Sequence, residues 1–171
     1  MSKPLQDALW QQFGASIDML ENAITDCPSY LWEAEVGTFS FWYMSYHTLF
    51  FLDYYLSHNP AEFQPPKPFT LSELNPDGEL PERVYSRQEL LTYLAYCRDK
   101  LREVILSVTG KENERRFVSK NKDYSLTEIL IYNMRHVHHH AAQLTLALRE
   151  RTAAAPQWVS RTKHALLHEP L

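Results

Sequence analysis

The chain has 171 residues, the size of a single domain spanning 1–171, with a formal net charge of −4 and eight histidines. The acidic balance argues against nucleic-acid binding, because no basic surplus can neutralise phosphates, and only four glycines argue against a Gly-rich phosphate loop. No apolar run of about 18 residues suits a membrane span and no signal peptide is visible, so we expect a cytoplasmic protein bound to neither nucleic acid nor membrane.

The first two predicted helices span about 4–26 and 38–57. In the first, apolar residues recur every three or four positions, Pro4 suits the first turn, and Pro28 follows its end. The second is dense in aromatic residues and has no internal turn signal over nearly 20 residues, which favours a helix over a strand. Thr38 is the predicted N-cap.

A proline-rich connection follows at 58–85 and holds six of the ten prolines. A disordered linker is one interpretation. The alternative is an ordered crossover anchored to the core by its apolar residues, which are Phe63, Phe69, Leu71, Leu74, Leu80 and Val84. A long crossover means that the two helices beside it need not be antiparallel neighbours.

The third and fourth helices are predicted at about 87–109 and 126–151. The third opens with a capping box formed by Ser86 and Glu89, and the fourth opens with a second box that begins at Ser125. Both continue with apolar residues at helical spacing.

Two further segments are predicted outside these helices. The charged run Lys111–Lys122 is expected to be a solvated loop, and the residues after Pro156 are expected to form a short C-terminal extension with some helix. Together, the elements predict an all-α fold, a four-helix bundle with a long crossover between helices 2 and 3.

Four histidines cluster in the fourth helix, but helix geometry divides them. At about 100° per residue, His136 and His140 fall on or beside the apolar face, one turn apart. His138 and His139 point away from it by roughly 120° to 140°. Two imidazoles at positions i and i+4 can bind one metal ion. The alternative is a pair of structural histidines that hydrogen-bond to neighbours.

His47 is the best candidate for a third metal ligand, because it lies on the most aromatic face of the second helix, where an imidazole is costly to bury without a partner. Gln143, Asn133 and Tyr43 are candidates for pocket residues or for orienting a ligand. For Gln143, a simple boundary position is an equally good interpretation, and Asn133 needs a hydrogen-bond partner in the core.

The sequence resembles the DinB-like (DinB/YfiT-like) metalloenzyme superfamily. The resemblance rests on Tyr46-His47 in the second helix and on the stretch from Arg135 to Leu144 in the fourth, and it covers about residues 4–151. It implies a four-helix bundle and a metal-ligand set of His47, His136 and His140. Family members often have Arg-Gly after the last histidine of the motif, whereas this chain has two alanines.

The resemblance also implies a function. It implies a divalent metal, with zinc or nickel expected first and iron or manganese as alternatives, and a homodimer that acts on a small-molecule substrate. Relatives include S-transferases and hydrolases that use a low-molecular-weight thiol such as bacillithiol or mycothiol. The alternative is a non-enzymatic protein that binds a metal or small ligand in a stress response. A Ser-His-Asp arrangement, a nucleophile elbow and a P-loop are all missing from the sequence.

Overall fold

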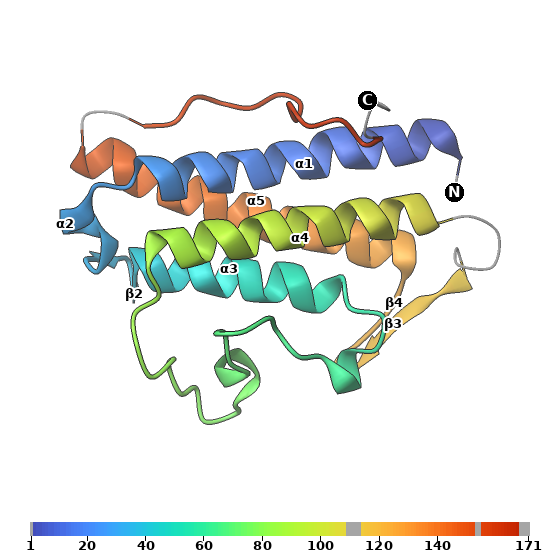
Figure 1. Ribbon diagram of the computed structural model, residues 1–171, viewed down its shortest axis with the longest axis horizontal. Coiled ribbons are helices and arrows are strands. Elements are labelled where there is room, and N and C mark those ends of the chain that lie inside the picture. Colours follow the sequence, from blue (N-terminus) through green and yellow to red (C-terminus); the bar gives the residue numbers. More distant parts are fainter. Residues whose placement is uncertain (1, 109–113, 153–154, 168–171) are drawn as a thin grey trace.

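The computed structural model is mostly helical, as expected, and describes residues 2–108, 114–152 and 155–167 (Figure 1). Its four long helices are α1 (Lys3–Asp26), α3 (Phe41–Tyr55), α4 (Arg87–Ser107) and α5 (Leu126–Arg151). Shorter elements connect them: α2 (Ser29–Trp32), β1 (Glu35–Val36), β2 (Phe39–Ser40), the 3-10 turns η1 (Pro60–Glu62) and η2 (Ser72–Leu74), β3 (Arg116–Ser119) and β4 (Lys122–Ser125).

The long helices pack so that α1 and α3 each contact both α4 and α5. Aromatic side chains fill much of the core between them, including the fully buried Trp10, Phe13, Tyr46, Phe50 and Tyr93. Figure 1 shows that α3 and α4 run in the same direction, so the connection between them has to return along the length of the helices. This path requires the long crossover that the sequence predicted.

The start of α3 differs from its prediction. The helix begins at Phe41 with Ser40 as its N-cap residue, so the prediction of Thr38 as N-cap is wrong. The reason is a small antiparallel hairpin, in which Glu35 pairs with Ser40 around a turn at Gly37. Gly37 has a φ of 73°, a left-handed conformation that a residue without a Cβ adopts without strain.

The crossover is ordered against α3 and α4, which settles the alternatives in favour of a folded segment. Phe63 and Phe69 are buried, and the Phe69 ring stacks on Tyr93 of α4 with centroids 4.2 Å apart. Tyr85 is a further buried anchor. The other four expected anchors, Leu71, Leu74, Leu80 and Val84, are exposed, and that part of the prediction is wrong.

The two predicted helix starts at Ser86 and Ser125 are confirmed. Ser86 and Glu89 form the full reciprocal capping box, whereas at Ser125 the hydroxyl accepts from the Glu128 amide at 3.2 Å without the reciprocal bond being formed in the described structure. The described part of α4 ends at Ser107, so the predicted extension to 109 falls in a segment outside the described residues.

The charged run predicted as a loop instead forms the antiparallel hairpin β3–β4 over 116–125, and 111–113 lie outside the described residues. Phe117 is the physical reason. It is buried against Tyr54 and Tyr55 of α3, with ring centroids 5.4 and 5.7 Å apart, while its two neighbours point outward. This ring anchors β3 on α3, and both strands of the hairpin also contact α5.

The C-terminal segment 155–167 has no regular helix, contrary to the expectation for the residues after Pro156, and lies along α1 (Figure 1). Its backbone is tied to that helix. The Trp10 indole donates to the His164 carbonyl at 2.7 Å, and the Thr162 amide donates to the Gln11 carbonyl at 3.2 Å. These contacts replace the intrahelical hydrogen bonds that the segment would otherwise make.

Gly14 lies where this segment approaches α1 most closely. A Cβ at this position would stand 2.7 Å from both Cβ and Cγ2 of Thr162. Although alanine is the better helix former by about 1 kcal/mol, we expect Gly14→Ala to release the segment and to lower the melting temperature. Thermal unfolding and limited proteolysis of 155–167 measure this. Unchanged protease resistance would contradict the close contact.

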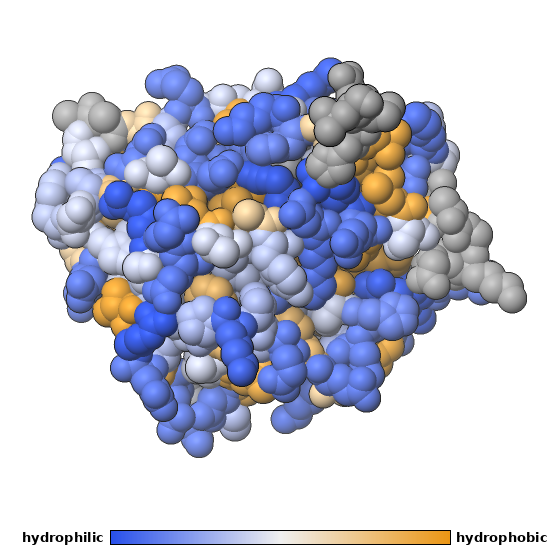
Figure 2. Space-filling model, viewed as in Figure 1, coloured by the Kyte–Doolittle hydropathy of each residue, from blue (hydrophilic) through white to orange (hydrophobic). Residues whose placement is uncertain are grey.

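The molecular surface seen in Figure 2 is largely hydrophilic, with small apolar patches between polar residues. Among the described helices, none combines the length and the apolar character needed to cross a bilayer.

Candidate metal centre

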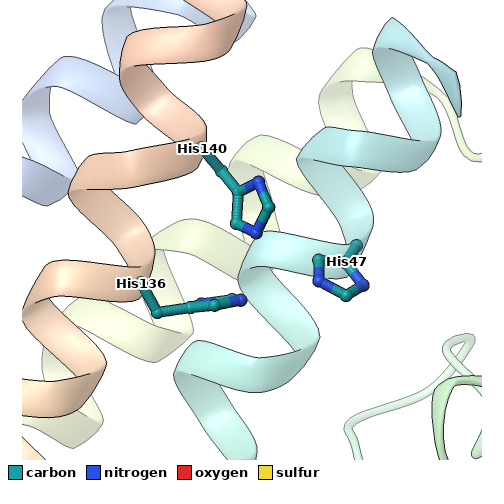
Figure 3. Close-up of side chains that lie close together, drawn as sticks. All are labelled: His47, His136 and His140. Carbon is teal, nitrogen blue, oxygen red and sulfur yellow. The ribbon is translucent and has the colours of Figure 1, made fainter. Parts of the chain in front are cut away.

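Three histidines from two helices face one another in the structure (Figure 3). His47 comes from α3, and His136 and His140 come from successive turns of α5. One ring nitrogen from each lies within 4.8 Å of the other two. The ring centroids are 5.5 Å apart for His47 and His136, 5.0 Å for His47 and His140, and 4.6 Å for the α5 pair. The predicted residues are therefore brought together.

The two remaining histidines of the α5 cluster do not join this group. His138 packs its ring against Trp158 of the C-terminal segment at 5.5 Å, and His139 is exposed. Their orientation follows from the helix period, as the angular argument predicted.

In two of the three imidazoles a hydrogen bond engages Nδ1, so Nε2 is the nitrogen that could bind a metal ion. Nδ1 of His47 lies 2.7 Å from Oε2 of Glu73, and Nδ1 of His140 lies 2.8 Å from Oε1 of Gln143. Both oxygens act as acceptors, so each Nδ1 carries a proton, and in a neutral ring Nε2 then keeps the lone pair that a metal ion needs. Nδ1 of His136 is buried and has no hydrogen-bond partner within the described residues.

Burial favours the neutral form of the two α5 imidazoles, His136 and His140. Burial, followed by the nearby His140 and His47 rings, lowers the pKa of His136 to about 3. Burial also lowers the pKa of His140 to about 4, although its hydrogen bond to Gln143 opposes the shift. Neutral imidazole is the form that binds a metal ion. The donor set thus fits a divalent ion, with three nitrogen ligands and coordination positions left for water or substrate.

The other predicted pocket residues separate into two near the histidines and one that is structural. The Tyr43 ring lies 6.4 Å from that of His47, and Gln143 contacts His140 as described above. Asn133 is fully buried, and its Nδ2 donates to the Leu52 carbonyl at 3.0 Å. That bond joins α5 to the backbone of α3 and gives Asn133 the core partner that the sequence required.

A groove of ≈ 890 Å³ lies between α1, α5 and the C-terminal segment, and of the three proposed ligands His136 alone lines it. Its lining includes His136 and Gln143 together with apolar side chains, among them Met19, Leu146 and Trp158. Its size is typical of small-molecule sites, and its lining mixes apolar side chains with polar and charged ones.

A second group of ligand-type side chains, Asp18, Glu21 and His164, also lies within metal-ligand separations. The Arg98 guanidinium occupies its centre, 3.0 Å from Asp18 and 2.7 Å from Glu21. Because Arg98 pairs with both carboxylates and Lys163 lies 4.0 Å from Glu21, the group is an ion-pair network rather than a metal site.

Glu73 contacts the candidate metal ligand His47, and the sequence did not indicate this contact. It lies in η2, within the proline-rich crossover and 26 residues from His47, and its side chain is only 3% exposed. A glutamate in a polar, proline-rich stretch reads as solvated, and no periodicity extends across that stretch to indicate otherwise.

One family model matches the chain, over residues 12–144, and its description is the DinB superfamily. The chain belongs to the DinB superfamily. The matched region contains all three histidines and the whole crossover, and it ends before the C-terminal segment. Neither curated proteins nor solved structures include a significant match to the chain.

Proposed function

We propose that this DinB superfamily protein is a divalent-metal-dependent enzyme whose ion is held by His47, His136 and His140. The observation that carries the proposal is the convergence of these imidazoles from two helices, two of them with Nδ1 tied to an oxygen acceptor. The resemblance to the family puts zinc or nickel first, with iron or manganese as an alternative, and imidazole ligands suit zinc, nickel and iron alike. A bound ion would polarise a substrate carbonyl or stabilise a coordinated thiolate.

The reaction we propose is thiol-dependent S-transfer or hydrolysis, with a low-molecular-weight thiol such as bacillithiol or mycothiol as co-substrate. Glu73, the carboxylate beside the histidines, is buried and hydrogen-bonded to His47, so it does not serve as a free general base. An external thiol that ionises at the metal needs no such base. The groove beside His136 offers room for a small-molecule substrate.

We also propose the family's fold, a homodimeric state and a cytoplasmic location for this protein. The four long helices would form the family's four-helix bundle, and the protein would act in the cytoplasm as a homodimer without binding nucleic acid. Native mass spectrometry of the full chain measures the oligomeric state, and a monomer at micromolar concentration would contradict the dimer.

The test of the proposed function uses protein purified without a histidine tag. Metal analysis is expected to find close to one divalent ion per chain. Turnover of a panel of electrophiles with bacillithiol, mycothiol and glutathione is expected to stop when a chelator is added and to return with the ion. Bound metal without any turnover would favour the alternative, a metal- or ligand-binding protein, and no bound metal would overturn the proposal.

A further inference from the structure

The carboxylate of Glu73 is held against His47 by the crossover, outside the three-histidine group. Its Oε2 lies 2.7 Å from Nδ1 of His47, and its side chain is 3% exposed whereas that of His47 is 30% exposed. A polar chain segment has thus placed a carboxylate deeper than the imidazole it contacts. Burying a charged group so deeply is costly unless a positive partner compensates.

Among the described residues, no lysine or arginine forms an ion pair with this carboxylate, and its close contact is with Nδ1 of His47. Its other oxygen, Oε1, has no geometric hydrogen-bond partner among the described residues, but the Tyr43 hydroxyl is a second polar neighbour of the carboxylate, and burial together with Glu73 raises the pKa of that hydroxyl. The hydrogen-bond donor that the structure gives Oε2 is the Nδ1–H group of His47. A cation on Nε2 would make the Nδ1 proton more acidic and the hydrogen bond to the carboxylate stronger.

The position of Glu73 is set by contacts of the residues beside it. The Tyr46 hydroxyl donates to the Thr70 carbonyl at 2.9 Å and lies 3.5 Å from the Ser72 hydroxyl, while Thr70 and Ser72 bond to each other at 3.2 Å. Tyr46 is the neighbour of His47 in α3 and is fully buried. Two adjacent residues of α3 therefore hold the crossover at this point: Tyr46 contacts the residues beside Glu73, and His47 contacts the Glu73 carboxylate.

We propose that Glu73 is a positioning residue of the metal centre, which holds the Nδ1 proton of His47 and so presents Nε2 to the ion. The inference rests on the proposed metal site. It makes the proline-rich crossover part of that site, because metal binding strengthens a contact that joins η2 to α3. Gln143 holds His140 in a similar way, but with a neutral amide on an exposed residue.

The first test is metal affinity, measured by competition with a chromogenic chelator on apo-protein loaded with zinc. Glu73→Ala is expected to weaken zinc binding about 10- to 100-fold. Glu73→Gln is expected to lie between wild type and Glu73→Ala, because the amide oxygen still accepts the Nδ1 proton but carries no charge. Glu62→Ala, an exposed glutamate elsewhere on the crossover, serves as the matched control and is expected to bind as wild type does.

The second test is the tautomer of His47, read from the ring nitrogens by NMR in metal-free protein. The wild type and Glu73→Gln are expected to keep the proton on Nδ1, whereas Glu73→Ala is expected to show the other tautomer as well. A purely structural role would not move this signal. Circular dichroism checks that each variant is folded, and Glu73→Gln carries the comparison if Glu73→Ala is not.

The outcomes separate the two proposals. If wild type binds one zinc ion and both Glu73 variants bind it equally well, the positioning role is overturned and the metal site stands. If wild type binds no zinc, the proposed function fails, and the inference about Glu73 fails with it. Weaker binding in the two variants, with the Glu62→Ala control unchanged, supports the inference.

Discussion

Replacing His47 by alanine is expected to weaken binding of a divalent ion about 100-fold or more. Removing a residue that only hydrogen-bonds to a metal ligand typically weakens binding about 10- to 100-fold, and removing a ligand itself costs more. The remaining pair on α5, His136 and His140, would hold the ion through two nitrogens only. Isothermal titration of metal-free, untagged protein measures the affinity, and metal analysis after dialysis measures retention.

The helix supplies its own matched controls for this experiment. His138 and His139 lie in the same turn of α5 as the proposed ligands but outside the group. We expect His138→Ala and His139→Ala to bind the ion as wild type does, and His136→Ala and His140→Ala to behave like His47→Ala. Equal binding by wild type and His47→Ala would show that the three-histidine assignment is wrong.

The largest expected loss of stability concerns the ion-pair network between α1, α4 and the C-terminal segment. Asp18 is 2% exposed, pairs with the buried Arg98 at 3.0 Å, and accepts from the Thr162 hydroxyl at 2.7 Å. Removal of one partner from a buried pair leaves an uncompensated charge and costs about 3–5 kcal/mol. Because Glu21 still contacts Arg98, we expect Asp18→Ala to cost about 3 kcal/mol of unfolding free energy.

Urea unfolding followed by circular dichroism measures that cost. The control is Asp7→Ala, which removes an exposed pair with Lys3 on the same helix and is expected to change stability by about 0.5 kcal/mol or less. Limited proteolysis should also show earlier cleavage of 155–167 in Asp18→Ala. A stability within about 1 kcal/mol of wild type would mean that the network is dispensable.

Sequence reasoning was reliable for long elements and for residues that share one helix. Apolar residues at helical spacing predicted α1, α4 and α5, because a long amphipathic helix repeats that spacing over many turns. The length of the aromatic stretch without a turn signal predicted α3. Sequence reasoning failed at the N-cap of α3, the β3–β4 hairpin and the C-terminal segment. At the β3–β4 hairpin and the C-terminal segment, contacts with distant helices, such as that of Phe117, decided the conformation. At the N-cap of α3, the local β1–β2 hairpin decided it.

In the candidate site, too, the sequence predicted some features and the tertiary structure decided the others. That His136 and His140 share a face, while His138 and His139 do not, was determined by the sequence alone, because the helix period fixes the angle between residues of one helix. That His47 meets them was decided by the packing of α3 against α5. The contact of Glu73 with His47 depends on the path of the crossover, which is set by side-chain packing and hydrogen bonds between segments distant in sequence rather than by any local periodicity.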